Sequence, residues 1–453
     1  MELFVTERGN KGLRFNNYTY RLIEVNKKSK RFRCTKKDCP ASLLTDCDEQ
    51  NIVKIGKPHN HEAPSTHAKE MQTAHASIKR KAEDSLNERL SKLVCSVVSS
   101  FSTITSRDLD NLTCQVRQYR QYRLKSRPKL PKTREEVLSV LRDYDSDFIM
   151  EIDESLQICL ITTVENLNFL SSSTHILADG TFQFCPRYFY QLYTFHGTRN
   201  GHFIPCVFAL LPNKKEATYT RALQMLRHMC REKNVSLHSE FFHFDLEDAM
   251  LSSCGHVFPD AKIKACNFHV GQAWHRKLQQ IGLAAEFQSN SETSTWLKSF
   301  FGLPALDPHE VEDCFAFVVM NNCPDSKSDL LCKFADYVFN NYISDSARYP
   351  PTLWASQDIA IRTTNACESF HNQFSKNFSS SHPNIFLFLE KLGDEQLRTN
   401  IKIRSAFQER RVQARHRERE ATRQAIISAY KKGEINQEEF LRRISFKSLP
   451  PKM

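Results

Sequence analysis

The chain has 453 residues, of which 40% are hydrophobic and 11% aromatic, so it can bury a sizeable core and is not disordered throughout. Its 63 Lys and Arg residues outnumber its 52 Asp and Glu residues, and the net charge of +11 makes nucleic acid the leading class of partner, although many basic proteins bind none. The longest apolar run, residues 203–211, is far shorter than the ~20 residues of a membrane span, and the first residues lack the pattern of a signal peptide, so we expect neither a membrane protein nor a secreted one.

The first 65 residues carry a pattern typical of a zinc site. Cys34 and Cys39 are separated by four residues, and His59 and His61 follow after nineteen more. Two thiolates and two imidazoles complete a tetrahedral Zn²⁺ site with no open position, which marks a structural site, and so short a segment would be marginal without it. The alternative is two free thiols and two surface histidines. We interpret Cys47 as a bystander.

The cysteine content fits this interpretation. The chain has fifteen cysteines, an odd number, and no signal peptide pattern. We therefore expect reduced thiols in the cytosol or nucleus, with some of them holding metal.

A basic run surrounds the first cysteine. Residues 27–37 include seven Lys or Arg residues and no acid. Basic side chains on a rigid, zinc-held strand can pair with phosphates, and Arg can also bind guanine edges in the major groove. The alternative is a solvated charged face. We expect DNA contacts from Lys28, Lys30, Arg31, Arg33, Lys36 and Lys37.

This segment resembles the FLYWCH-type zinc finger, a relative of the WRKY-type finger. The matching residues are Phe4, Gly12-Leu13, Tyr18 or Tyr20, Phe32-Arg33-Cys34, Cys39 and His59-Asn60-His61. Phe32 stands where the family usually has Trp. The resemblance covers nearly all of residues 1–65. It implies a small, zinc-bound antiparallel sheet that binds DNA, with Cys34, Cys39, His59 and His61 as the ligands.

Residues 66–145 predict a helical, basic linker. Apolar residues between Leu86 and Val98 have the spacing of an amphipathic helix. The run Arg117–Pro128 alternates Arg with Tyr, which suits phosphate pairing and stacking on bases. An exposed helix end with its Tyr residues packed inward is the alternative. Pro128 and Pro131 mark the boundary to the next zone.

Residues 146 to about 380 alternate apolar, strand-like runs with helical patterns. The predicted strands are residues 174–179, 188–195, 202–211, 241–245 and 261–266. Helices are predicted at 215–231, at 247–254 and from His269 onward. Pro205 indicates a bulge or an edge in the third strand. The order β-β-β-α-β-α-β-α predicts a mixed α/β sheet.

Two of these strands end in an acid, Asp179 and Asp245. If the strands are neighbours, the two carboxylates lie side by side and repel unless a divalent cation sits between them. A third acid, Glu368, opens a helix-like segment. Three carboxylates can hold two Mg²⁺ ions that activate water or a 3′-hydroxyl in phosphoryl transfer. Any one of these acids alone is more often a solvated surface group, so the combination carries the hypothesis.

The strings around these acids resemble the catalytic domain of MULE (Mutator-like) transposases, within the DDE, RNase H-like group. The matching strings are Leu177–Phe182, Phe244–Met250, Val257–Ala261, Cys266–Ala273 and Thr364–His371. The resemblance covers roughly residues 100–400. It implies an α/β RNase H-like domain in which Asp179, Asp245 and Glu368 bind Mg²⁺ or Mn²⁺. It also implies an α-helical insertion at about 270–360, whose Trp and Phe residues we interpret as a helical core.

Three histidines and a cysteine lie near these acids in the sequence. Cys266 and His269 correspond to a Cys/His pair characteristic of the group. Their spacing also allows half of a metal site, but no second pair follows, so we expect either a structural role or support near the DNA end. His243 and His371 are either groups that surround the acids or ordinary strand and helix residues.

The tail after about residue 380 is helical and basic. Between Arg398 and Arg423 it has nine Lys or Arg residues and three Glu. Such a segment either follows DNA or acts as a nuclear-import signal, and the alternative is a solvated helix with i,i+4 ion pairs.

We therefore predict a finger at 1–65, a helical linker at 66–145, a catalytic domain at 146–380 and a basic helical tail at 381–453. The predicted function is a nuclear DNA transposase. The finger and linker recognise double-stranded DNA at terminal inverted repeats, and the catalytic domain hydrolyses a phosphodiester and joins the freed 3′-hydroxyl to target DNA. A homo-oligomer holds the two DNA ends. The alternatives are a domesticated transposase that binds DNA without cleaving it, as a transcriptional regulator, and a protein-binding zinc adaptor.

Overall fold

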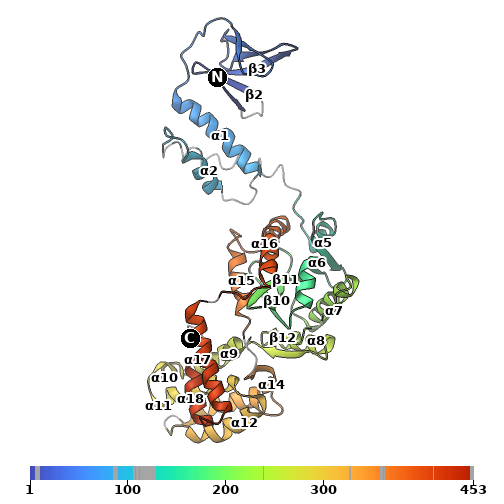
Figure 1. Cartoon of the computed structure of the whole chain (residues 1–453), viewed down its shortest axis with the longest axis vertical. Coiled ribbons are helices and arrows are strands. Elements are labelled where there is room, and N and C mark those ends of the chain that lie inside the picture. Colours follow the sequence, from blue (N-terminus) through green and yellow to red (C-terminus); the bar gives the residue numbers. More distant parts are fainter. Residues whose placement is uncertain are drawn as a thin grey trace. The chain divides into compact units, whose positions relative to one another are not determined.

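The computed structural model describes the chain in two compact units, Met1–Leu130 and Pro131–Met453 (Figure 1). The described residues are 1–5, 11–84, 90–105, 108, 112, 129–237, 239–325, 328–357, 361, 363–411 and 413–448. The run Arg117–Pro128, for which we predicted DNA contacts, lies outside them. None of the described helices is long and apolar enough to cross a membrane.

The first unit begins with a six-stranded antiparallel sheet in sequential order. Its strands are β1 (Glu2–Val5), β2 (Lys11–Phe15), β3 (Tyr18–Asn26), β4 (Ser29–Cys34), β5 (Ser42–Thr45) and β6 (Ile52–Ile55). Asn16 and Asn17 join β2 to β3 with φ of 45° and 69°, a conformation that suits Asn in a two-residue hairpin turn. Leu13, Phe32 and Leu43 are buried on one face of the sheet. This is the small β-rich sheet that the sequence predicts.

Two helices follow in the same unit, α1 (Thr66–Asp84) and α2 (Leu90–Val98). Ala74 and Ile78 of α1 pack against Leu93, Val94 and Val97 of α2. The apolar spacing that predicted an amphipathic helix therefore gives a helix pair with its own small core.

The second unit is built on a seven-stranded mixed sheet of order β13-β12-β9-β10-β11-β8-β7. Its strands are β7 (Ile149–Asp153), β8 (Ile158–Thr162), β9 (His175–Thr181), β10 (Gln191–Arg199), β11 (His202–Leu211), β12 (Phe241–Phe244) and β13 (Lys262–Ala265). β9, β12 and β13 run parallel to one another, and the other neighbours are antiparallel. The predicted mixed sheet is therefore confirmed.

The sequence-based strands differ from the observed ones in number and at several strand ends. β7 and β8 were not predicted. β10 begins at Gln191 rather than 188, because Tyr188 has a φ of 80° and cannot continue a strand. The bulge expected at Pro205 is present, since the register between β10 and β11 shifts beside Pro205, where Phe195 pairs with Val207 and His196 with Pro205.

Helices cover both faces of this sheet. One face packs against α6 (Val164–Ser171), α7 (Glu216–Glu232) and α8 (Asp248–Val257). The other face packs against α5 (Arg134–Arg142), α15 (Asn365–Ser375) and α16 (Ile385–Ser405). The central strands β9, β10 and β11 are thus buried on both sides, which explains their near-continuous apolar runs.

A separate helical cluster surrounds Trp274 and Trp354, whose rings lie 5.6 Å apart. Its α-helices are α9 (Asn267–Gln280), α10 (Ala284–Gln288), α11 (Glu292–Ser299), α12 (Val311–Cys314), α13 (Ser328–Val338), α14 (Pro351–Trp354), α17 (Ala414–Lys431) and α18 (Gln437–Ser448). Short 3₁₀ and π segments lie between them, at Phe300–Ala305, Pro308–Glu310, Phe315–Val319, Met320–Asn322 and Phe339–Ile343. Figure 1 shows α17 and α18, drawn in red, among α10, α11 and α12. Part of the basic tail therefore completes the core of this cluster.

Candidate metal centres and nucleic-acid surface

Four side chains of the finger meet as a ligand set for a tetrahedral ion. Sγ of Cys34 lies 3.2 Å from Nε2 of His61, Sγ of Cys39 lies 3.4 Å from Nδ1 of His59, and these two nitrogens are 3.4 Å apart. All four ligand atoms lie within 4.8 Å of one another. Zn–S and Zn–N bonds of tetrahedral sites place the ligand atoms about 3.3–3.8 Å apart. The four residues predicted as ligands therefore fit Zn²⁺.

Neighbouring groups orient the two imidazoles. The Tyr20 hydroxyl lies 2.7 Å from Nε2 of His59, and the carbonyl oxygen of Glu62 lies 2.7 Å from Nδ1 of His61. Each contact leaves the opposite ring nitrogen for a metal. Tyr18 stacks on His59 with 3.5 Å between ring centroids. Burial, and then the neighbouring His61, lower the pKa of His59, which favours the neutral form that binds metal.

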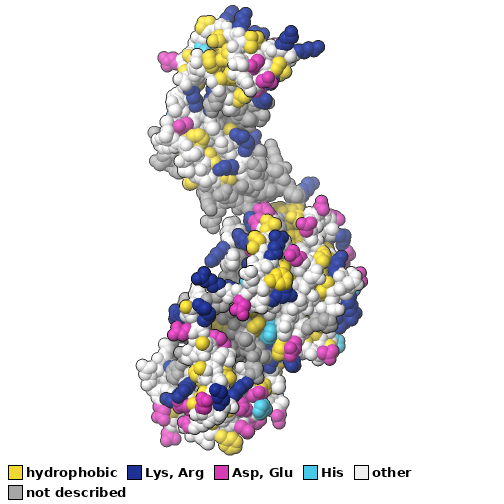
Figure 2. All heavy atoms as spheres, in the orientation of Figure 1, with side chains coloured by type: hydrophobic (Ala, Val, Ile, Leu, Met, Phe, Trp, Pro, Cys, Tyr) yellow, Lys and Arg dark blue, Asp and Glu magenta, His cyan; other side chains and the backbone are white. Residues whose placement is uncertain are grey.

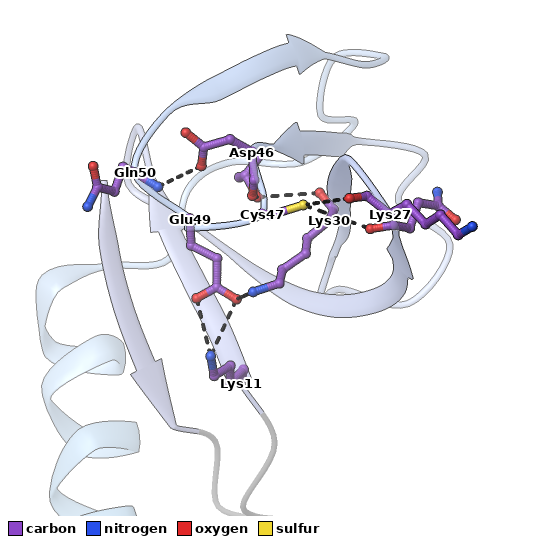
Figure 3. A network of polar contacts seen from close by, with 9 residues as sticks. Lys11, Lys27, Lys30, Asp46, Cys47, Glu49 and Gln50 are labelled. Carbon is purple, nitrogen blue, oxygen red and sulfur yellow. Dashed lines mark hydrogen bonds and ion pairs between the residues drawn. The ribbon is translucent and has the colours of Figure 1, made fainter.

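Strand β4 divides the predicted DNA-contacting residues between two faces. Arg31 and Arg33 are exposed, whereas Phe32 and Cys34, which alternate with them, point into the core. Lys30 shares the inner face, and its Nζ lies 2.7 Å from Oε1 of Glu49, whose side chain is only 3% exposed (Figure 3).

Lys30 is thus part of the fold of the finger. Lys11 also contacts the Glu49 carboxylate, at 3.4 Å, and Figure 3 shows both amines converging on it. The hydrogen bond from Lys30 lowers the pKa of Glu49, so this buried carboxylate stays ionised between two cations. Lys30 therefore has less charge to offer a phosphate than its neighbours on β4.

The exposed face of the finger carries further basic residues. Arg21 of β3 pairs in register with Arg33, and Lys54 of β6 pairs with Leu44, the partner of Arg31. Because paired residues of neighbouring strands share a face, these four basic residues lie on one face of the sheet, Arg21 with Arg33 in one cross-strand row and Arg31 with Lys54 in the next. Lys28, Lys36 and Lys37 are exposed in the adjoining turns. Figure 2 shows Lys and Arg side chains projecting from the edges of the finger.

The two strand-end acids of the second unit lie on adjacent parallel strands. Leu177 of β9 pairs with His243 of β12, so the same register two residues further along places Asp179 beside Asp245. The Asp179 side chain is 14% exposed and that of Asp245 is 43% exposed. The backbone N–H of Gly180 donates to Oδ1 of Asp179 at 2.7 Å. A Cβ at Gly180 would lie 2.9 Å from the ring of Tyr193, so glycine follows Asp179 for lack of space.

The third acid, Glu368, is joined to Asp245 through His269. Nδ1 of His269 lies 3.2 Å from Oδ1 of Asp245, and Nε2 lies 3.4 Å from Oε1 of Glu368. Burial alone lowers the pKa of His269, but the Cys266 thiol and the charges of Asp245 and Asp179 outweigh it and raise this pKa to about 9. The imidazolium thus bridges the two carboxylates. Burial also raises the pKa of Glu368, against the opposing charge of His269.

The three acids do not form a closed ligand cluster. Across the part of the chain that the structure describes, the finger supplies the one set of three or more His, Cys, Asp or Glu ligands within 4.8 Å of each other. Cys266 is buried and accepts a hydrogen bond from the backbone N–H of Thr364 at 3.2 Å, on the segment that leads into α15. Cys266 therefore links the start of α9 to the helix that carries Glu368.

His371, whose role the sequence pattern leaves open, lies next to Asp179, with Nδ1 3.5 Å from Oδ2. It is three residues after Glu368, so both project from one face of α15. Thr194 and His196 of β10, which sequence reasoning missed, extend this contact into the interior. Their signal in the sequence is slight: Thr194 and His196 are alternate residues that flank the apolar Phe195. His243 lies apart from this group, 2.9 Å from His175.

Two family models match the chain. Residues 4–61 match the FLYWCH zinc finger domain, a range that includes all four zinc-type ligands. Residues 175–273 match the MULE transposase domain, a range that includes Asp179, Asp245, Cys266 and His269 and ends before Glu368. The search of curated proteins finds no match. Both resemblances are therefore confirmed, and together they support a transposase-like protein that binds DNA.

Proposed function

We propose that this chain is a DNA transposase, in which the finger binds the ends of a mobile element and the second unit cuts and joins the DNA. The observation that carries the proposal is the placement of Asp179 and Asp245 side by side on parallel strands, within a range that matches the MULE transposase domain. The mixed sheet with helices on both faces is, on this proposal, an RNase H-like catalytic domain, and the helical cluster contains its insertion.

Asp179, Asp245 and Glu368 would hold the catalytic Mg²⁺ or Mn²⁺. Carboxylate oxygens are the ligands these cations prefer. Asp245 and Glu368 approach one another through His269, and Asp179 lies on the neighbouring strand β9 in register with Asp245. When bound, the cations supply an activated water or 3′-hydroxyl and stabilise the leaving oxygen. The protein itself orients Asp179 through Gly180 and seats Glu368 on the first turn of α15.

The DNA surface proposed for the finger is the basic face formed by Arg21, Arg31, Arg33 and Lys54 with the neighbouring turn lysines. These side chains are exposed, and a rigid sheet held by zinc fixes their spacing. Their contacts with phosphates would position the finger, and the arginines would read bases in the groove. We further propose that the protein acts in the nucleus as a homo-oligomer, because two DNA ends must be held together.

One observation favours the alternative of a DNA-binding regulator that does not cleave. His269 bridges Asp245 and Glu368, so a positive charge already stands between two of the three acids. A cation shared by Asp245 and Glu368 would compete with the His269 ring for their oxygens. A protein that no longer cleaves could retain such an arrangement.

Affinity capture of fragmented genomic DNA from the source organism, at a stated salt concentration, tests the proposal. Enrichment of repeated sequences with inverted ends is expected of a transposase, and it supplies the oligonucleotide for a cleavage assay. Enrichment of scattered, unique sites would contradict the transposase and favour the regulator. The Arg33→Ala variant, with its reduced basic face, serves as the control for capture that depends on the finger.

A further inference from the structure

A chain of buried polar groups runs from Asp179 into the sheet. Oδ2 of Asp179 faces Nδ1 of His371 at 3.5 Å, Nε2 of His371 lies 2.8 Å from the Thr194 hydroxyl, and that hydroxyl lies 2.9 Å from Nε2 of His196. Thr194 and His196 are at most 1% exposed, and the His371 side chain is 9% exposed. The catalytic role proposed for the three acids does not by itself require these buried groups.

The single proton of the Thr194 hydroxyl limits which of these polar groups can donate a hydrogen bond and which can accept one. A hydroxyl has one proton, so at most one of the two imidazole nitrogens that face it can accept a hydrogen bond. At least one of these nitrogens must carry its own proton. The backbone oxygen of Asp179, at 3.4 Å, is a third and longer contact of the same hydroxyl.

The carboxylate of Asp179 selects among the remaining arrangements. If Nε2 of a neutral His371 carried the proton, its bare Nδ1 would face the negative charge of Asp179 across 3.5 Å. If His196 donates to Thr194 and Thr194 donates to His371, the proton of His371 lies on Nδ1 and faces the carboxylate. Only this set of donor and acceptor roles leaves each neutral group with a favourable partner.

The rings are held in place by packing. His196 lies against Phe370 with 5.2 Å between ring centroids, and Phe370 stacks on Phe374 of the same helix. Complete burial, and then the nearby His371 and Lys402, hold the pKa of His196 well below its usual range, so its ring is neutral, as the chain requires. The other carboxylate oxygen of Asp179 already accepts the Gly180 N–H. Both oxygens of Asp179 are thus fixed by the protein.

We propose that His371, oriented by His196 through Thr194, is a positioning residue that holds the Asp179 carboxylate ready for a divalent cation. This inference rests on the proposed function, because it assigns the relay His196–Thr194–His371 to the same acid, Asp179. At 3.5 Å the contact is longer than an ordinary hydrogen bond, and we expect it to shorten when a cation engages the carboxylate.

Nitrogen NMR of the full chain, with labelled histidine and zinc bound, tests the orientation. Loss of a signal in His371→Gln identifies the His371 ring, and its nitrogen shifts report which nitrogen carries the proton. We expect the proton on Nδ1 in the wild type and in Thr194→Ser, which keeps the hydroxyl. In Thr194→Val, which keeps the shape and loses the hydroxyl, we expect the Nε2–H form to appear.

Binding of Mn²⁺, followed by the paramagnetic resonance of the free ion, gives the second measurement. Thr194→Val should raise the dissociation constant roughly 10-fold, as loss of a partner behind a metal ligand typically does, while Thr194→Ser retains the wild-type value.

A His371 ring with its proton on Nε2 or on both nitrogens, or unchanged Mn²⁺ affinity in Thr194→Val, would overturn the relay. If Thr194→Val does not fold, the wild-type ring and Thr194→Ser still decide. Absence of Mn²⁺ binding in the wild type would count against the proposed function, and the ring measurement alone would then decide whether the relay exists.

Discussion

The apolar core of the finger is too small to stabilise the fold by itself. A metal ion bound by Cys34, Cys39, His59 and His61 would supply the missing stability. Among the described residues, that core is formed by the two cysteines with Leu13, Tyr20, Phe32, Ala41 and Leu43. So few buried side chains make a small core for a segment of this length, and domains of this size usually need a metal or a disulfide to be stable. Zinc binding contributes about 10–16 kcal/mol in small fingers, and we expect it to decide whether this finger folds.

The first prediction concerns one of these ligands. Cys34→Ser should release zinc and unfold the finger, because the remaining three ligands cannot close a tetrahedral site. Metal analysis of the purified protein and the circular dichroism of the finger strands measure the two effects. Cys47→Ser is the matched control, since this thiol donates to the backbone carbonyls of Asn26 and Lys27 and stands outside the ligand set (Figure 3). Unchanged zinc content in Cys34→Ser would contradict the ligand set.

A second residue-scale prediction concerns acid stability. Burial alone would raise the pKa of Asp153, but hydrogen bonds from Ser155, from the backbone of Leu156 and from Arg221 lower it from 3.8 to about 2. A carboxyl whose pKa is lower in the folded state stabilises that state above its ordinary pKa, and the stabilisation is lost as the pH falls.

We therefore expect the second unit to lose about 2 kcal/mol of stability from this residue as the pH falls from about 4 to about 2. Denaturant unfolding of the wild type and of Asp153→Asn at several pH values measures it. The difference between the two proteins should shrink in acid. The exposed Asp260→Asn is the control and should follow the wild type. A difference that does not change with pH would contradict the assignment.

At the scale of the element, β4 shows that alternate residues of one strand serve different purposes. Arg31 and Arg33 point to solvent, while Lys30 neutralises the buried Glu49. The sequence of β4 shows only a run of basic residues. The difference between its two faces becomes visible once the neighbouring strands are in place.

The third prediction follows from this division. Arg33→Ala should weaken DNA binding for all sequences and lower the salt slope by about 1, without a change in stability. Lys30→Ala should instead destabilise the finger by about 1–3 kcal/mol, because Glu49 loses its closest partner, and should change DNA affinity little. Titrations of a DNA duplex at several salt concentrations, with thermal unfolding of each variant, separate the two. Equal effects of both substitutions on the salt slope would contradict it.

The contact of α18 with the helical cluster gives the fourth prediction. A Cβ at Gly302 would lie 2.5 Å from Oγ of Ser445 and 3.0–3.1 Å from the side chains of Leu441 and Ile444. Gly302→Ala should therefore destabilise the second unit by about 1–3 kcal/mol. Gly393 lies inside α16, and a Cβ there would meet no atom of the described residues within 4 Å, so Gly393→Ala should stabilise the unit by about 0.4–1 kcal/mol. Denaturant unfolding measures both, and the same sign for the two variants would contradict the packing.

For the whole molecule, local sequence patterns were a good guide wherever the determinants are local. The order of strands and helices from β9 to α9, the bulge at Pro205 and the zinc-type ligand set follow from short-range periodicity, proline chemistry and ligand spacing. Each of these features is decided by residues that lie close together in the chain or by a ligand preference.

The features that were missed depend on distant partners. No local pattern indicates that α18 completes a core formed largely by residues 265–355. Nor does one indicate that the Glu49 side chain is buried in contact with Lys30. The same holds for the contact of His371 with Thr194, which lies on a strand 177 residues away. The bridge made by His269 also depends on two segments, one ending in Asp245 and one carrying Glu368.

The central claim is that Asp179 belongs to a metal-dependent catalytic centre, and one measurement tests it most directly. The full chain is incubated with Mn²⁺ and the DNA ends that it captures, and strand cleavage and joining are followed on a gel. The fifth prediction is that the wild type and the control Asp260→Asn cleave, whereas Asp179→Asn binds the same DNA within a few fold and does not cleave, because it lacks a charged ligand for the cation. Cleavage by Asp179→Asn at the wild-type rate would contradict the assignment of this acid.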